Sequence, residues 1–354
     1  GYERVIAHRS SSVYSYAAQA DGKVTEVDET TKMCKIQYKD GSTHTFQYGE
    51  TYGECADMVT TLKLELTVKK GDTFKRGDIL CYNPEYFEKD PTSRQVDWKH
   101  GVMATVAIMD CSRTFEDSSS ISKEFGEKLE IQPVQVRQIN LIANTIIHDA
   151  KKVGDTVDVN DYLLIFEDAE AADITSISTN ESTLDYIAKL NRKTPKARVA
   201  GTIVKIEAYY SSPVSEMHPT LGKLVKDAIK DVTGKHKFSQ GSATSGEYPT
   251  SQPLPEGTKF KNVKFEKDTV VLRYFIREEI TAGIGDKIVF DSSLKSVIGS
   301  IHDDATTESG KVIDALFSGS SISNRIVCSP LITGTGEQVL ECLEDEAVRL
   351  YFGK

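Results

Sequence analysis

Paired Gly-Asp turns are the feature that most limits how this chain can fold. Two pairs, Gly71-Asp72 and Gly77-Asp78, lie close together, with apolar residues between and after them. Glycine takes the positive-φ position of a turn at no steric cost, and the aspartate that follows can cap the turn. The pattern recurs at Gly154-Asp155 with Asn160-Asp161, and again at Gly285-Asp286. Such turns between short apolar runs predict small β modules.

Doubled turns are also typical of lipoyl and biotinyl carriers, which present a modifiable lysine between hydrophobic neighbours. No Met-Lys-Met-like tripeptide occurs here, which disfavours a carrier. Other catalytic signatures are missing from the sequence as well. There is no Gly-x-Ser-x-Gly elbow, no phosphate-binding Gly-x-x-x-x-Gly-Lys-Ser/Thr loop and no Gly-x-Gly-x-x-Gly loop after a strand. The seven histidines show no paired metal-ligand spacing.

The size and composition are typical of a soluble globular protein. A chain of 354 residues, 39% hydrophobic and 27% charged, can form two or three domains with real cores. No apolar run approaches the ~20 residues of a membrane span, and no charged-then-apolar leader is present. Six scattered cysteines without a Cys-x-x-Cys pair indicate a reducing cytosolic setting. The net charge of −10 disfavours a free-standing nucleic-acid binder, but allows a subunit with few, local contacts.

Hydrophobic periodicity predicts a mainly β chain with a few helices. Strands are expected at 5–7, 22–27, 34–38, 101–109, 198–206, 269–276 and 324–331. Helices are expected at 121–129, 182–193, 216–237 and 337–350, the first capped by Ser118, Ser119 or Ser120. The Ser-, Gly-, Thr- and Pro-rich segment 238–258 is predicted to be a mobile loop, and 333–336 a turn. Gly201 within a strand indicates a bulge or a close backbone approach.

The stretch 283–301 predicts a hairpin that carries two lysines. Apolar runs at 288–290 and 297–298 flank a polar break at 291–293, and Lys287 and Lys295 bracket that break. Two ammonium groups held near each other on strands repel unless an anion lies between them. The pair is therefore either two solvated surface charges or a clamp for phosphate oxygens.

A second candidate site is the acidic pair Glu116-Asp117, which follows Arg113, Thr114 and Phe115. Acidic residues are favoured near a helix N-terminus by the helix dipole. The same pair could instead be aimed at a metal-bound phosphate or a basic partner. The sequence leaves both interpretations open.

In their order and spacing, these segments resemble the β subunit of multi-subunit DNA-directed RNA polymerases. That family has a doubled Gly-Asp turn, then an apolar strand, Phe-Glu-Asp and Ser-Glu-Arg/Lys; the last two are matched here by 115–117 and 121–124. Gly-Asp-Lys and a second lysine follow, matched by 285–287 and Lys295. An apolar strand ending in Pro-Leu and a Gln-[apolar]-Leu-Glu helix complete the order, matched by 326–331 and 338–341. The resemblance spans nearly the whole chain, but only the C-terminal half of a full β subunit.

The resemblance implies an α+β fold: a double-psi β-barrel interrupted by a flap-like insertion, plus a small sandwich-hybrid β module. Residues 1–100 would form the sandwich-hybrid module, which leads into the barrel. Residues 101–140 and 266–335 would form the barrel, and 141–265 the flap-like insertion with the mobile loop 238–258. Residues 337–354 would form a C-terminal helix.

The implied function is nucleotidyl transfer by a DNA-directed RNA polymerase, with this chain inactive alone. Lys287 and Lys295 would act as catalytic phosphate contacts to the RNA 3′ end or the incoming nucleotide, and Arg113 as a further phosphate contact. Glu116 and Asp117 would lie near the substrate-borne magnesium. Mg²⁺ would be held mainly by a β′-type subunit, and this chain alone would bind none.

The implied partners are the β′-type subunit, other polymerase subunits, template DNA, the RNA transcript and nucleoside triphosphates, with no membrane. The implied location is the cytoplasm, or the host cytoplasm or virion if the protein is viral.

Two departures from the family pattern bear on activity. The family has Arg-His-Gly between the lysines, whereas this chain has Asp291-Ser292-Ser293, and the arginine expected after Pro-Leu is missing from 332–336. An arginine supplies a bidentate phosphate contact that other residues do not replace. The short, divergent chain resembles the split β fragments of large bacteriophage polymerases. The alternative is a catalytically inert barrel protein that acts as a phage structural or assembly component.

Overall fold

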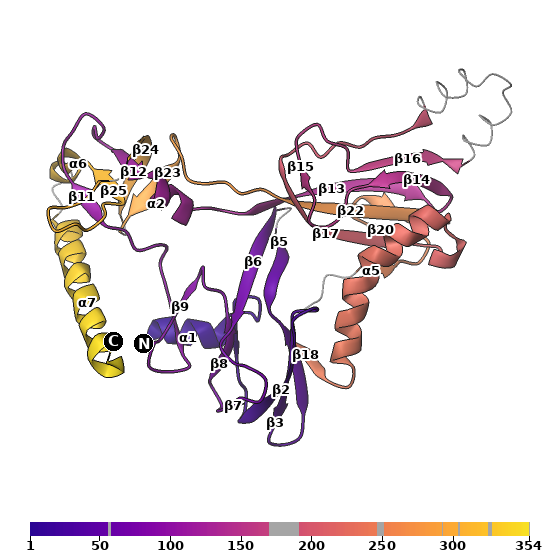
Figure 1. The fold of residues 1–354 in the computed structure, drawn as a ribbon, viewed down its shortest axis with the longest axis horizontal. Coiled ribbons are helices and arrows are strands. Elements are labelled where there is room, and N and C mark those ends of the chain that lie inside the picture. Colours follow the sequence, from indigo (N-terminus) through magenta and orange to yellow (C-terminus); the bar gives the residue numbers. More distant parts are fainter. Residues whose placement is uncertain are drawn as a thin grey trace. The chain divides into compact units, whose positions relative to one another are not determined.

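The structure, a computed structural model, describes residues 1–55, 58–169, 191–245, 251–291, 293–303, 305–324 and 328–353 (Figure 1). It is mainly β, with 41% strand and 22% helix, which confirms the predicted α+β composition. The chain forms two compact units. Unit 1 comprises Gly1–Asp90, Arg94–Trp98 and Gln132–Glu279, and unit 2 comprises Pro91–Ser93, Lys99–Ile131 and Ile280–Lys354. None of the helices among these residues is long and apolar enough to cross a membrane.

Unit 1 is built on two main sheets. The described part of the larger one has the order β1-β8-β6-β13-β22-β17-β15, with β19 on β17 and β5 on β6. Their bounds are β1 Ser15–Ala17, β5 Gly49–Cys55, β6 Met58–Leu66, β8 Ile79–Tyr82, β13 Pro133–Ile142, β15 Thr156–Val157, β17 Gly201–Tyr210, β19 Gln252–Pro253 and β22 Thr269–Arg277.

The second sheet of unit 1 has the order β18-β4-β3-β2-β7. Its strands are β2 Gly22–Asp28, β3 Met33–Tyr38, β4 Thr43–Gln47, β7 Thr73–Phe74 and β18 Ala243–Ser245. Three two-stranded ribbons and three helical segments complete the described part of the unit. They are β9 Phe87–Lys89 with β10 Val96–Trp98, β14 Thr145–Ala150 with β16 Leu164–Asp168, β20 Lys259–Phe260 with β21 Val263–Lys264, α1 Tyr2–Arg9, the 3-10 helix η1 Val214–Glu216 and α5 Pro219–Ser239.

Strand β22 is an interior strand of the larger sheet, and it confirms the strand predicted at 269–276. It pairs antiparallel with β13 on one side and β17 on the other, and all its interior residues are buried. One face of this sheet packs on a core that includes Ile203, Leu272 and Tyr274, and α5 contributes Leu221 and Val225 to the same core. In α5 the apolar residues recur every third or fourth position, so the helix turns one apolar side toward this core, whereas β22 is apolar on both faces and also contributes Val271 and Phe275 to separate buried clusters.

The Gly-Asp turns adopt the predicted geometry. Gly71, Gly77, Gly154 and Gly285 all have φ between +88° and +97°. In each turn the aspartate that follows accepts a hydrogen bond from the backbone N–H three residues before it, at 2.8–3.0 Å. Asp161 makes the same bond to the Asp158 N–H, at 2.8 Å, where asparagine replaces glycine. The local sequence therefore correctly predicts the positive φ of each glycine and the capping aspartate of each turn.

One prediction in unit 1 is wrong, a second is wrong in part, and a third concerns residues that the structure does not describe. The strand at 5–7 is wrong, because these residues lie in helix α1, and a short apolar run does not distinguish a strand from a buried helix segment. The loop at 238–258 is wrong in part, because β18 adds to β4 as a parallel strand and β19 to β17. The helix at 182–193 falls almost entirely outside the described residues.

Unit 2 contains a five-stranded mixed sheet in the order β11-β25-β12-β24-β23. Strands β11 and β25 are parallel, as are β12 and β24, whereas β12 with β25 and β23 with β24 are antiparallel. Pairing among the described residues does not return from β23 to β11, so these strands form no closed barrel. The elements of the unit are β11 Val106–Ile108, β12 Ser118–Ser122, β23 Lys287–Phe290, β24 Leu294–His302, β25 Ala315–Phe317, α2 Lys123–Lys128, α6 Gly319–Ser323 and α7 Ser329–Phe352.

The two long stretches of unit 2, Lys99–Ile131 and Ile280–Lys354, pair through their strands and also through an isolated bridge at the ends where they adjoin unit 1. The N–H of Ile131 donates to the Ile280 carbonyl at 2.9 Å, and the N–H of Ile280 donates back to the Ile131 carbonyl at 3.0 Å. The chain therefore leaves this unit, builds the 132–279 part of unit 1, and returns beside its point of departure.

Several predictions in unit 2 are wrong. Only three residues of the buried strand expected at 101–109 form a strand, β11, and Met103 and Ile108 are exposed. Residues 118–120 belong to strand β12, and Ser122 caps the short helix α2 by accepting the Phe125 N–H.

The strand and turn expected between 324 and 336 are also wrong where the structure describes them, because α7 begins at Ser329. Proline is tolerated in a first helical turn, and the hydroxyls of Thr333 and Thr335 donate to carbonyls four residues earlier.

Candidate functional site

The two predicted lysines lie on one face of the β23–β24 hairpin. Lys287 pairs directly with Val297, and Lys295 pairs directly with Val289. Opposed residues in an antiparallel ladder point to the same side, and every second residue shares that side. Lys287 and Lys295 are therefore diagonal neighbours, about 7–8 Å apart on this type of lattice. Both side chains are exposed.

The opposite face of the hairpin anchors it to the core of unit 2. Phe290, Leu294 and Ile298 are buried there, with Ile298 only 1% exposed. The rings of Phe290 and Phe317 lie 5.3 Å apart between centroids, at a tilt of 58°. A hairpin with one apolar buried face presents its other face in a fixed register, because slipping by one residue would expose the apolar set. The backbone under the two lysines is therefore held in place.

The acidic segment runs beside the same hairpin. The Asp117 carbonyl accepts hydrogen bonds from the Val297 N–H at 2.9 Å and from the Ser296 hydroxyl at 2.8 Å. Parallel pairing of β12 with β24 continues from this contact, with Ser118 opposite Val297. Glu116 has φ of +49°, and its carbonyl accepts a bond from the Ser321 hydroxyl. The carboxylate pair and the lysine hairpin, far apart in sequence, therefore share one region of unit 2.

Arg113 lies in a tight turn that leads into the acidic segment. The Thr114 hydroxyl accepts the Cys111 N–H at 3.1 Å and donates to the Met109 carbonyl at 2.9 Å, which closes the turn. Arg113 itself is exposed. No described contact joins Arg113 to Lys287 or Lys295. Its one relation to the lysines is that it precedes the acidic segment, which runs beside the hairpin.

The electrostatics of the lysine pair are mild. Two unit charges in water at the spacing of the underlying backbone positions, about 7 Å, would repel by about 0.6 kcal/mol, which an exposed hairpin tolerates. Neither lysine makes an ion pair with the residues that the structure describes. Repulsion alone therefore does not require an anion between them, and the case for phosphate rests on their shared face and neighbours. Asp291 occupies the hairpin turn with φ of +52° and brings a carboxylate into the same region.

The described residues contain no cluster of three or more His, Cys, Asp or Glu side chains that could hold a metal ion. Glu116 and Asp117 supply two carboxylates. Mg²⁺ prefers octahedral oxygen coordination completed by water, substrate phosphates and further carboxylates. Two carboxylates alone leave most of that coordination sphere unfilled, so an ion at this position would need ligands from a substrate or from another chain.

Sequence reasoning missed a buried charged cluster in unit 1. Glu207, on β17, accepts hydrogen bonds from Arg273, Lys205 and Tyr209, at 3.0, 2.7 and 3.1 Å. The carboxylate is almost fully buried, and burial lowers the pKa of Lys205 although Glu207 opposes the shift. In the sequence, Lys205 and Glu207 occupy alternate positions of one strand and therefore share a face. Charged residues in this pattern normally predict a face exposed to solvent, so the pattern gave no hint of burial.

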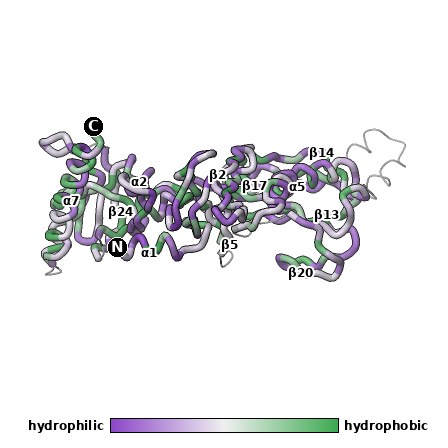
Figure 2. Tube along the Cα trace, turned by 90° about the horizontal axis from the view of Figure 1, so that it is seen from below, coloured by the Kyte–Doolittle hydropathy of each residue, from purple (hydrophilic) through white to green (hydrophobic). Residues whose placement is uncertain are grey.

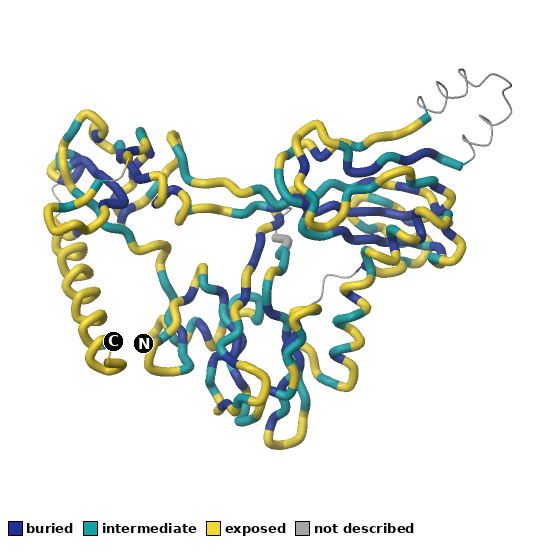
Figure 3. The backbone as a smooth tube through the Cα atoms, viewed as in Figure 1, coloured by how far each residue is buried: buried dark blue, intermediate teal, exposed yellow. Residues whose placement is uncertain are grey.

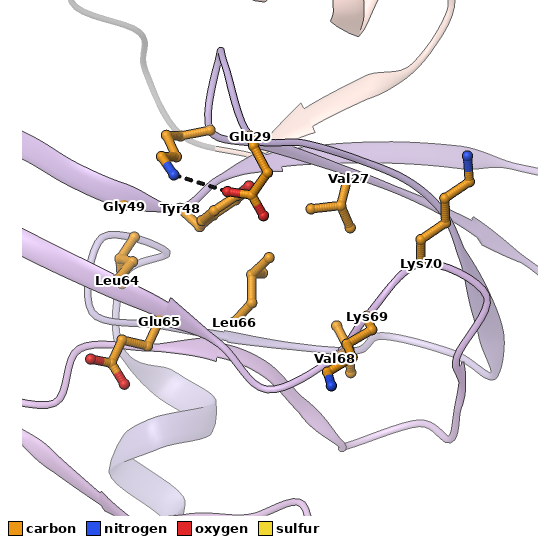
Figure 4. Close-up of a pocket in the computed structure, with 11 residues that line it drawn as sticks. Val27, Glu29, Tyr48, Gly49, Leu64, Glu65, Leu66, Val68, Lys69 and Lys70 are labelled. Carbon is orange, nitrogen blue, oxygen red and sulfur yellow. Dashed lines mark hydrogen bonds and ion pairs between the residues drawn. The ribbon is translucent and has the colours of Figure 1, made fainter.

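A pocket of about 620 Å³ opens on unit 1 and was also not predicted (Figure 4). Leu64, Leu66 and Val27 give it an apolar lining, and Lys32 and Glu29 form an ion pair of 2.9 Å at its edge. It contains none of the five predicted site residues. The Lys70 amine points away from the apolar lining (Figure 4).

Neither the protein-family models nor the curated proteins give a match to this chain. The family resemblance therefore rests on the sequence motifs alone.

Proposed function

We propose that this chain is a β-type subunit of a multi-subunit DNA-dependent RNA polymerase, in which Lys287 and Lys295 contact phosphate oxygens. The observation that carries the proposal is the hairpin, on which two lysines share one exposed face above a buried apolar layer. The carbonyl of Asp117, bonded to the strand that carries Lys295, gives further support.

The proposed chemistry is in-line attack of an RNA 3′ hydroxyl on the α-phosphate of a nucleoside triphosphate. Negative charge is spread over the phosphoryl oxygens in the transition state, so fixed cations beside them lower the barrier. Lys287 and Lys295 would supply such charges, with Arg113 as a further phosphate contact. Magnesium held mainly by a β′-type partner would add Lewis acidity, with Glu116 and Asp117 near the substrate-borne ion. The isolated chain would be inactive.

The finer fold assignment belongs to the same proposal. A double-psi β-barrel in unit 2, a flap-like insertion and a sandwich-hybrid module are what the resemblance implies. The combination of parallel and antiparallel pairs around β12 favours the barrel assignment, whereas the lack of pairing between β23 and β11 among the described strands counts against it. Template DNA, transcript, nucleotides and other polymerase subunits would be the partners, in the cytoplasm of a cell or of a bacteriophage host.

The experiment is reconstitution of the chain with a β′-type chain and the remaining subunits. Lys287→Met and Lys295→Met should each slow single-nucleotide addition by ~100-fold or more, the loss expected for a charge that stabilises the transition state. Lys267→Met, which removes an exposed lysine from unit 1, serves as the matched control and should leave the rate unchanged. Wild-type rates in both hairpin variants would refute the proposed role.

The alternative is a barrel protein that kept the fold and lost the chemistry, as a phage structural or assembly component. Asp291 favours it, because a carboxylate in the turn between the two lysines repels phosphate oxygens. The same reconstitution separates the two. A complex that assembles and binds template but adds no nucleotide supports the inert protein, whereas partnership with a chain bearing an Asp-x-Asp-x-Asp loop argues for a working subunit.

A further inference from the structure

Helix α7 is a long helix without a packing partner in its own unit. It runs for 24 residues, from Ser329 to Phe352, and Pro330 is its one buried residue. Figure 3 shows the rest of the helix as exposed along almost its entire length. Its described tie to the body of unit 2 is the ion pair between Lys311 and Glu341, at 3.3 Å.

An exposed helix such as α7 depends for its stability on packing against another element or another chain. Isolated helices are marginal in water even when their sequences favour helix, and most helical stability in proteins comes from packing one apolar side. The first two turns of α7 contain Gly334 and Gly336, each less favourable than alanine in a helix. Thr333 and Thr335 add β-branched side chains to the same turns. The sequence is therefore poorly suited to a free-standing helix.

Four apolar residues in the second half of α7, Leu340, Leu343, Ala347 and Leu350, have the spacing of a heptad seam. Leu340 and Leu343 are 65% and 60% exposed, and Leu350 is 71% exposed. Spacings of three and four residues place one set of side chains along a single stripe. Figure 2 shows hydrophobic and hydrophilic residues interspersed along this helix. The seam consists of Thr333, Gly336, Leu340, Leu343, Ala347 and Leu350.

The edges of the seam are acidic. Glu337 and Glu344 flank it on one side and Glu346 on the other, and the whole helix carries five carboxylates against one arginine. That arginine, Arg349, already pairs with Glu346 at 2.7 Å. Residues beside the seam of a coiled coil set partner choice through their charge. A second copy of α7 would place carboxylates against carboxylates, whereas a helix with lysine or arginine at these positions would neutralise them.

We infer that α7 is a docking surface for a basic amphipathic helix of another protein chain. The partner packs its own leucine-type side chains against the seam and places lysine or arginine beside the three flanking glutamates. The inference uses only α7 and is independent of the lysine hairpin and of nucleotidyl transfer.

The experiment measures binding of a fluorescent four-heptad peptide to the full chain by anisotropy. The basic peptide carries leucine at the seam positions and lysine at the flanking positions; the acidic control has glutamate instead of lysine. The basic peptide should bind at least tenfold more tightly, and its affinity should fall as salt rises, because exposed charge pairs are screened. Leu343→Asp should weaken binding at least tenfold. Gln338→Asp, the matched control on the outer side of α7, should not.

Three outcomes would overturn the inference. One is equal affinity for the two peptides, or no binding of the basic one. Another is an equal loss of affinity in the Leu343→Asp and Gln338→Asp chains. The third is a chain dimer in sedimentation that Leu343→Asp dissociates, which would make a second copy the occupant. None of these readouts involves nucleotide addition, so failure here is distinct from failure of the proposed function.

Discussion

Replacing Arg273 with methionine should destabilise unit 1 strongly, because the substitution removes the main cationic partner of a buried carboxylate. Glu207 is 1% exposed and Arg273 is 6% exposed, and they lie directly opposite each other on β17 and β22. The guanidinium lies 3.0 Å from one carboxylate oxygen, and the Lys205 amine lies 2.7 Å from the other. The four-residue cluster with Tyr209 thus holds one buried cation and one buried anion, and the partly buried Lys205 amine as a second cation.

The magnitude follows from what each variant leaves behind. Breaking a buried ion pair costs about 3–5 kcal/mol, because an uncompensated charge remains in the interior. In the Arg273→Met chain, Lys205 and Tyr209 still contact the carboxylate, so we expect about 3 kcal/mol. In the Glu207→Gln chain, two cations lose their counter-charge, so we expect about 5 kcal/mol. The double variant should lose at least 1 kcal/mol less than the sum, because the sites are in contact.

Urea unfolding followed by fluorescence measures these losses, because the one tryptophan, Trp98, belongs to unit 1. Lys39→Met provides a matched control, since it removes a cation from an exposed ion pair with Asp21 and should leave the midpoint nearly unchanged. A loss below 1 kcal/mol for Arg273→Met, or strict additivity in the double variant, would contradict the view that this cluster acts as one buried unit.

Two further predictions concern unit 1. Gly201→Ala should cost about 1–3 kcal/mol in thermal or urea unfolding, because an added Cβ would lie 2.2 Å from the Arg277 carbonyl oxygen; wild-type stability would show that the strands separate easily. Burial raises the pKa of the Cys34 thiol from 9.0 to about 12, so the unfolded chain loses this proton first and stability should fall as pH rises from about 9 to 12. We expect a loss of about 2–3 kcal/mol at pH 11 from this group, absent in Cys34→Ala; equal pH slopes in both chains would refute it.

The parts of the fold that were predictable are those fixed by local chemistry. The Gly-Asp turns, the hairpin at 283–301 and the strand at 269–276 each follow from a few adjacent residues, and each is confirmed. Helices α1 and α7 illustrate what local sequence does not decide. The three apolar residues at 5–7 are compatible with a strand or a helix, and they lie in helix α1. The proline and glycines within 330–336 are typical of a turn, but they lie in the first turns of helix α7.

The candidate site was predictable to a similar degree. The period of a strand places Lys287 and Lys295 on one face once the hairpin register is known. The contact of Asp117 with Val297 depends on parallel pairing between segments far apart in the chain, for which no local signal exists. The Glu207 cluster depends on the register of β17 against β22, and a bulge between Ile203 and Lys205 shifts that register. Long-range pairing, rather than residue type, limits such prediction.

The bridge between Ile131 and Ile280 gives unit 2 a continuous path that does not depend on what lies between those two residues. Neighbouring strands of a sheet lie about 5 Å apart, so a tight turn could connect the same two points. The polypeptide between them can thus lengthen, shorten or be exchanged in evolution while unit 2 keeps its connectivity. A shortened gene that begins at Lys99 and joins Ile131 to Ile280 would encode the two long stretches of unit 2 without unit 1.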